Sequence, residues 1–233
     1  MGCTRSTWYR IDEDIRLSIV ISDNDAASRL ILWLGFDYIK KALKNKGLTY
    51  LAIERLMLNR GTLVESPAFE LRFAGQTIYQ PPKPVSLEAS CHEKNNQIGN
   101  CATASDLVGT LARFVQPEYF SKEERFILNQ SDRVWLQEIM AHTPRQEGFE
   151  FSDNYCRFLT GVEKQVAKRS GRMLSKCGVA LFSNTYVDLS FIETDDGQKY
   201  YIVFAVTPPG SITEEAIIQW MNTTASFILS QLS

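Results

Sequence analysis

Two short groups of polar residues in this 233-residue chain could do chemistry together. Ser22-Asp23-Asn24 offers a hydroxyl, a carboxylate and an amide, and Lys176-Cys177-Gly178 offers an ammonium group and a thiol. Taken alone, the first group has an ordinary structural explanation as a helix cap or turn, and the second as a lysine at a strand end. A further copy, Ser152-Asp153-Asn154, shows how weak the tripeptide is by itself. The argument for chemistry therefore rests on the sequence around each group.

The surroundings of both groups are informative. An apolar stretch with helical spacing leads into Ser22, and small residues and then a second helical apolar stretch follow Asn24. Lys176 stands at the head of a first strand, with the strand-like stretch 179–182 just after it, and two more strand-like stretches follow at 185–192 and 200–206. Ser152-Asp153-Asn154 has no matching surroundings.

In this order, the two groups and their surroundings resemble the penicilloyl-serine transferase superfamily, which includes the class A β-lactamases and related penicillin-binding hydrolases. Its three signatures are Ser-x-x-Lys, Ser-Asp-Asn and Lys-Thr-Gly. The resemblance covers residues 11–58, 103–140 and 172–231. It implies an α+β, β-lactamase/transpeptidase-like fold, with a helical lobe, an antiparallel sheet and a C-terminal helix packed on that sheet, and with the N-terminal strands missing.

The resemblance also implies a role for each residue. Ser22 would relay a proton toward the leaving nitrogen, Asn24 would hold the substrate amide, and Lys176 would be a fixed cation near the substrate carboxylate. The strand through Cys177 and Gly178 would pair with the substrate. Cys177 stands where the family has threonine or serine, and a thiol is the weaker hydrogen-bond donor. We expect Ser22 and Lys176 to face each other across one cleft.

The nucleophile of the family is not found. The chain contains no Ser-x-x-Lys sequence, and only 21 residues precede Ser22. Its nearest imitation, Cys91-His92-Glu93-Lys94, follows Ser22 and therefore has the wrong position in the chain order. Three explanations stay open: a truncated reading frame, a natural homologue that binds without turnover, or a separate chain that supplies the rest.

A loop glutamate that activates the deacylating water is a further expectation from the class A β-lactamases. Glu93 lies upstream of the helix that begins near Thr103, roughly where such a loop would run. The alternative for Glu93 is a solvated loop acid.

The elements that must position these residues fit one domain over 1–233. Residues 11–170 are expected to be mainly helical with a long, mostly irregular loop over 59–100, and residues 171–233 to form antiparallel strands and a closing helix. Two start boxes, Thr103 to Asp106 and Ser121 to Glu124, predict helices from about 103 and over about 121–140. Asp195-Asp196-Gly197 predicts a hairpin turn.

Composition excludes several classes of function. The formal net charge of -2 and the mixed charges give no sign of a nucleic-acid or membrane partner. The five scattered cysteines indicate free thiols, and neither histidine has a metal-site spacing, so we expect no metal and no cofactor. Without a signal sequence the chain as encoded is expected to be cytoplasmic, although the family usually works in the periplasm or outside the cell. The oligomeric state is open.

Two functions follow from the resemblance. One is a serine hydrolase that cleaves β-lactams or D-alanyl peptides through an acyl-enzyme and so confers antibiotic resistance. The other is a non-catalytic, vestigial or ligand-binding homologue with the same fold. A third interpretation leaves the family aside and makes the chain an α+β scaffold that binds a partner through residues 59–100.

Overall fold

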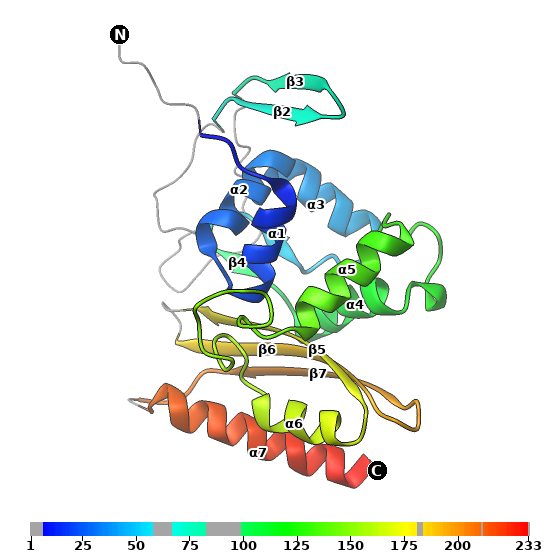
Figure 1. Cartoon of the computed structure of the whole chain (residues 1–233), viewed down its shortest axis with the longest axis vertical. Helices are drawn as coiled ribbons and strands as arrows, with labels where there is room; N and C mark the ends of the chain where they lie inside the picture. Colours follow the sequence, from blue (N-terminus) through cyan, green and yellow to red (C-terminus); the bar gives the residue numbers. More distant parts are fainter. Residues whose placement is uncertain (1–6, 58–66, 83–98, 181–183, 211, 233) are drawn as a thin grey trace.

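A three-stranded antiparallel sheet separates two groups of helices (Figure 1). The computed structural model describes residues 7–57, 67–82, 99–180, 184–210 and 212–232. The sheet has the order β5-β6-β7, with β5 at Arg172–Ala180, β6 at Thr185–Glu193 and β7 at Lys199–Val206. In the described part of the chain, β5 and β7 are therefore the edge strands.

Within the described residues, five α-helices lie on one side of the sheet and two on the other (Figure 1). The first group comprises α1 (Ile11–Val20), α2 (Asn24–Leu34), α3 (Phe36–Asn45), α4 (Ala104–Val115) and α5 (Gln130–Ala141). The second comprises α6 (Thr160–Lys168) and α7 (Glu214–Leu232). A short 3-10 helix, η1 (Pro117–Tyr119), follows α4. No helix in the described ranges has the length and apolar character to cross a membrane.

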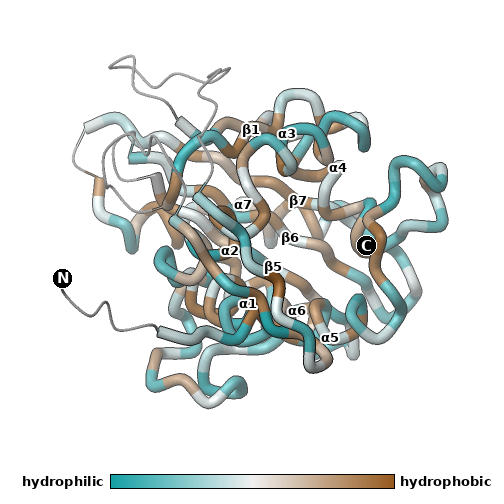
Figure 2. Tube along the Cα trace, turned by 90° about the horizontal axis from the view of Figure 1, so that it is seen from above, coloured by the Kyte–Doolittle hydropathy of each residue, from teal (hydrophilic) through white to brown (hydrophobic). Residues whose placement is uncertain are grey.

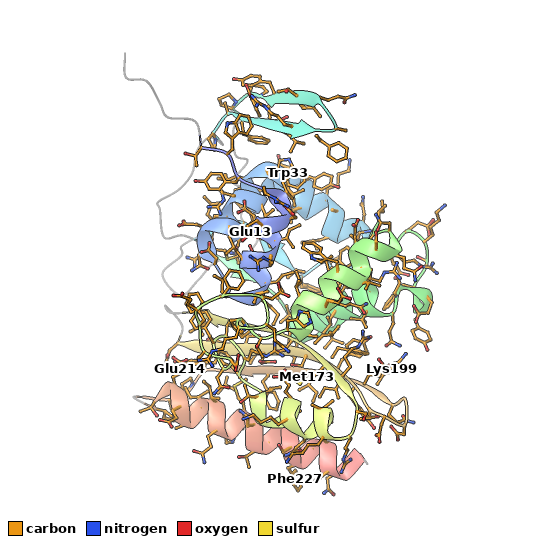
Figure 3. The ribbon with its side chains drawn as sticks, in the orientation of Figure 1. Glu13, Trp33, Met173, Lys199, Glu214 and Phe227 are labelled. Atoms are coloured by element: carbon orange, nitrogen blue, oxygen red, sulfur yellow. A yellow bond between two sulfur atoms is a disulfide. The ribbon has the colours of Figure 1, made fainter. Side chains whose placement is uncertain are left out.

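The two faces of the sheet carry different cores because side chains alternate along a strand. Met173 and Ile192 face α6 and α7, where they pack with Val162, Ile217 and Met221. Leu174 and Phe191 face the other way and pack with Leu111 of α4. Figure 3 shows the labelled Met173 in the layer between the sheet and α6. Figure 2 shows hydrophobic stretches running through the sheet, with hydrophilic stretches at the periphery.

The junction between α1 and α2 is fixed by an ion pair. Arg29 of α2 donates two hydrogen bonds to Asp14 of α1, from Nε to Oδ2 at 2.9 Å and from Nη2 to Oδ1 at 2.6 Å. The Asp14 side chain is only 7% exposed. A two-point contact of this kind fixes orientation as well as distance. It holds the two helices around the turn that contains Ser22.

Two expectations about local structure need correction. The start box at Ser121 forms, because Ser121 N donates to Glu124 Oε2 and Glu124 N donates to Ser121 Oγ. The residues that follow form a turn and not a helix. Helix α5 begins nine residues later, where the Asn129 side chain accepts a hydrogen bond from Asp132 N. Competing N-caps on the same stretch explain the error, because the later cap leads directly into the apolar helical pattern.

The segment 59–100 is less irregular than expected. Strands β2 (Phe69–Phe73) and β3 (Gln76–Gln80) form a hairpin whose turn residues Ala74 and Gly75 both have positive φ. This is the geometry of a tight two-residue turn. Two short strands, β1 (Ala52–Ile53) and β4 (Asn100–Cys101), pair on either side of the segment. Residues 58–66 and 83–98 lie outside the described residues.

Candidate active site

Ser22 and Lys176 meet in the structure. Lys176 Nζ donates a hydrogen bond to Ser22 Oγ at 2.6 Å, although the two residues are 154 positions apart in the chain. Ser22 comes from the junction between α1 and α2, and Lys176 comes from the edge strand β5. The expected proximity of the two residues is therefore confirmed.

Lys176 is held by further contacts and is unusually easy to deprotonate. Its Nζ also donates to the carbonyl oxygen of Cys177 at 2.8 Å and lies 3.8 Å from Cys156 Sγ. Burial lowers the pKa of Lys176 to about 8, and the nearby Asp188 acts in the opposite direction. Near pH 8, a substantial fraction of the Lys176 side chains is therefore the neutral amine, which can accept a proton.

The backbone at Ser22 adopts a conformation that favours glycine. Its φ is +55°, in the left-handed region. The turn is fixed on both sides, because Asp23 N donates to Leu17 O at 3.1 Å and Asp23 Oδ1 accepts from Ala26 N at 2.7 Å. Non-glycine residues in this region cluster at functional sites when the surrounding structure enforces them. Here the turn presents the hydroxyl of Ser22 to the amine of Lys176.

Gly178, two residues after Lys176 on strand β5, has space around it. Among the described residues, a Cβ at this position would meet no atom within 4 Å. Strand β5 is an edge strand of the described sheet, so its outer main-chain groups can pair with an extended ligand. The site therefore combines a lysine, a hydroxyl and the edge of a strand.

Cys177 is not a thiol in the structure. It forms a disulfide with Cys156, with a Cα–Cα distance of 5.5 Å, and Cys101 is disulfide-bonded as well. The expectation of free thiols is wrong for these residues, because the fold brings distant cysteines together in a way that sequence spacing does not reveal. As a consequence, Cys177 has no S–H to donate to a ligand. The disulfide instead ties the segment before α6 to the strand of Lys176.

The remaining sequence candidates take different positions. Asn24 is exposed as the first residue of α2. The second tripeptide, at 152–154, forms turns in which Ser152 O accepts from Tyr155 N and Asn154 O accepts from Arg157 N. Glu93, the candidate loop acid, lies outside the described residues, as does the whole of 91–94.

One buried acid near the site escaped the sequence reasoning. Asp188 of β6 is fully buried and accepts hydrogen bonds from Ser190 Oγ at 2.5 Å, Ser175 Oγ at 3.3 Å and Phe158 N at 3.3 Å. Burial raises its pKa. Asp188 and Ser190 alternate along β6 with the buried residues Tyr186 and Ile192 on the same face of the strand. Two polar residues on an otherwise apolar strand face were therefore the sequence signal that could have indicated a buried acid.

Comparison with solved structures identifies the fold. A chromosome-encoded β-lactamase of Vibrio parahaemolyticus superposes with a TM-score of 0.59 at 18% identity, covering 97% of this chain. A β-lactamase from Sphaerobacter thermophilus gives 0.55 at 19% identity over 92% of this chain. One from Burkholderia vietnamiensis gives 0.60 at 13% identity over 95%. The fold is therefore α+β and resembles that of the class A β-lactamases.

This chain spans 66%, 61% and 62% of the length of those three structures, respectively. No curated protein matches the chain at a significant level. The model of the Beta-lactamase enzyme family (Beta-lactamase2) matches residues 3–230, which is nearly the whole sequence. The chain therefore belongs to the β-lactamase enzyme family.

Proposed function

We propose that the site formed by Ser22 and Lys176 binds amides that carry a carboxylate, such as β-lactams or D-alanyl peptides, as part of an acyl-transfer site. The observation that carries this proposal is the 2.6 Å contact between Lys176 Nζ and Ser22 Oγ beside the open edge of β5. Family membership supports a small-molecule substrate.

Each group has a physical role in this proposal. In its protonated form, Lys176 attracts the substrate carboxylate, and its partly buried position strengthens that attraction. Ser22 passes a proton toward the leaving nitrogen, and the exposed amide of Asn24 is available to the substrate amide. The main chain at Gly178 pairs with the substrate backbone, and the absence of a side chain there leaves room for it.

Hydrolysis of the usual family type needs one more group. The 233 residues contain no Ser-x-x-Lys sequence, so that serine would come from a polypeptide segment beyond them. The second candidate function is ligand binding without turnover. Two observations favour it. The sequence contains no Ser-x-x-Lys, and the disulfide-bonded Cys177 stands where the family has a hydroxyl-bearing residue.

Both candidate functions require ligand binding at this site, and a binding experiment tests that requirement. Benzylpenicillin and a D-alanyl-D-alanine peptide are titrated into the full chain by calorimetry. Binding should weaken at least about 10-fold in Lys176→Met, because the variant lacks the cation. Lys164→Met, which changes an exposed lysine of α6, is the matched control and should bind normally. If wild type and Lys176→Met bind equally, or neither binds, the proposed site is wrong.

A turnover assay separates the two functions. Hydrolysis of a chromogenic cephalosporin by the chain alone would favour the hydrolase, and binding without hydrolysis would favour the non-catalytic homologue.

A further inference from the structure

The β2–β3 hairpin forms a separate small sheet at the opposite end of the molecule from α7 (Figure 1). Among the described residues, no third strand pairs with either of its strands. Residues 67–72, which include most of β2, line a cavity together with Trp8 and Trp33, whereas β3 contributes Tyr79 alone of its five residues. Strand β3 is therefore the outer strand, and its unpaired edge faces away from the helices. A two-stranded hairpin is only marginally stable on its own, so further strand pairing would stabilise this one.

The outer edge of β3 lacks the features that normally prevent a strand from pairing with another chain. Natural edge strands carry charged side chains, prolines or bulges. Strand β3, Gln76–Gln80, contains no charged residue and no proline, and its register with β2 is continuous. Its residues Ile78 and Tyr79 are 54% and 62% exposed, and isoleucine, tyrosine and threonine all favour strands. The inner strand β2, by contrast, carries Glu70 and Arg72.

The sequence of β3 is complementary to itself. It reads Gln-Thr-Ile-Tyr-Gln, with the same residue type at both ends and Ile78 at the centre. When two copies of β3 pair antiparallel about a two-fold axis at Ile78, the two isoleucines lie opposite each other. Gln76 then lies opposite Gln80 of the second copy, and Thr77 lies opposite Tyr79 of the second copy. Each position therefore meets a side chain of matching polarity or of high strand propensity.

The main chain favours the same register. In an antiparallel ladder counted from the two-residue turn at 74–75, hydrogen-bonded and non-hydrogen-bonded pairs alternate. This alternation directs the main-chain N–H and C=O of Thr77 and Tyr79 outward, and those of Ile78 toward β2. A second β3 strand can therefore form hydrogen bonds at Thr77 and Tyr79 on either side of an axis at Ile78. The turn precedes this strand and Pro81 follows it, so an axis at Ile78 is the one centre that pairs all five residues.

We propose that two copies of this chain form a two-fold dimer through the outer edges of their β3 strands, which joins the two hairpins into one four-stranded sheet. A second copy is the partner that this edge fits, because self-complementarity about an axis is what a two-fold interface requires. Two five-residue strands bury little surface, so the dimer should be weak and depend on concentration. The proposal does not depend on the proposed function, since α1 and α2 lie between the hairpin and β5, the strand of Lys176 (Figure 1).

Sedimentation equilibrium of the full chain, from about 2 μM to about 500 μM, tests for the dimer. The wild-type mass should rise toward twice that of one chain across this range. Ile78→Lys should stay monomeric, because two ammonium groups would meet at the axis. Phe73→Lys is the matched control and should dimerise like wild type, since Phe73 is 75% exposed on the same face of the hairpin but lies in β2. A wild type that is monomeric throughout, or a dimer that Ile78→Lys leaves intact, would refute the proposal.

Introduced cysteines test the register. The axis places the two Ile78 residues in a non-hydrogen-bonded pair with Cα atoms about 4.5 Å apart, within reach of a disulfide. Under mild oxidation Ile78→Cys should therefore give a cross-linked dimer on a non-reducing gel. Gln76→Cys alone should give no more than the wild-type background, because its two copies lie about 13 Å apart along the strands. A mixture of Gln76→Cys and Gln80→Cys should cross-link.

The outcomes of the cross-linking are decisive for the interface and separate it from the proposed function. No dimer in Ile78→Cys, or a dimer in Gln76→Cys alone, would refute pairing through β3. Calorimetry with Lys176→Met tests the other site, so either proposal can fail while the other stands.

Discussion

The disulfide between Cys156 and Cys177 fixes the segment before α6 to the edge strand β5, one residue away from Lys176. It closes a chain segment with a sequence separation of 21 residues. Lys176 lies against both ends of this bridge, because Nζ contacts Cys156 Sγ and the Cys177 carbonyl. The bridge thus supports the side chain on which the proposed chemistry depends.

Removing the bridge should destabilise the fold. A disulfide that closes a segment of this length stabilises the folded state by about 3 kcal/mol, because it reduces the conformational entropy of the unfolded chain. We expect Cys156→Ser with Cys177→Ser to lower the free energy of unfolding by about that amount, measured by urea denaturation without reductant. Substitution is preferable to reduction because Cys101 is also disulfide-bonded. A double variant as stable as wild type would contradict the prediction.

Glycine should be more stable than alanine at Ser22, where the backbone is left-handed. At a serine within a helix the order of stability should be reversed. Both Ser22→Gly and Ser22→Ala remove the hydroxyl, but glycine fits a φ of +55° and alanine does not. Ser22→Gly should therefore be about 1 kcal/mol more stable than Ser22→Ala. Ser18 lies within α1, so there alanine should be the more stable by a similar amount. Thermal or urea denaturation of the four variants gives both differences.

Lys176 should make stability depend on pH. Its pKa is about 8 in the folded chain and returns to the ordinary value of 10.5 on unfolding. Between these values the unfolded chain binds more protons, so folding becomes more favourable as the pH rises. Below about pH 8, the cost of keeping Lys176 protonated in its buried position lowers the free energy of unfolding by an amount on the order of 3 kcal/mol.

The Lys176→Met variant isolates this effect. Its stability should exceed that of wild type most near pH 7, and the difference should shrink as the pH approaches about 10. Urea titrations of wild type, Lys176→Met and the exposed control Lys164→Met measure it. A difference that does not change with pH would show that Lys176 titrates normally.

The Asp14–Arg29 pair should matter far more than an exposed pair nearby. Loss of Arg29 would leave the 7% exposed carboxylate of Asp14 without its partner and loosen the junction that carries Ser22. We expect Arg29→Met to cost about 2 to 4 kcal/mol in unfolding free energy. Arg10→Met breaks an ion pair with Asp12 whose side chains are 80% and 54% exposed, and should cost little. Equal effects of the two substitutions would show that the buried pair has no special role.

Local sequence signals predicted much of the fold. Helical spacing gave α1 to α3, the Thr103 cap gave α4, and the Asp195-Asp196-Gly197 turn lies between β6 and β7 as expected. Helix α6 was not predicted, because its nine residues begin without a side-chain cap. The predicted helix over 121–140 began too early, since two caps competed for one apolar pattern.

The site was predictable only in part. The resemblance to a family placed Ser22 opposite Lys176, and the structure confirms that contact. The disulfide between Cys177 and Cys156 was not predictable, because sequence spacing alone does not show which of the other cysteines the fold places beside Cys177. The burial of Asp188 depended on which face of β6 the helices α6 and α7 cover. Pairwise tertiary contacts of this kind are not encoded in local spacing.

The 154-residue separation of Ser22 and Lys176 has a consequence for how the protein matures. Neither half of the chain can assemble the pair alone, because Ser22 lies in the turn after α1 and Lys176 lies in strand β5. Long-range contacts form late, after the entropy of closing the intervening chain has been overcome. The Ser22–Lys176 contact would therefore report that β5 has docked against the junction of α1 and α2.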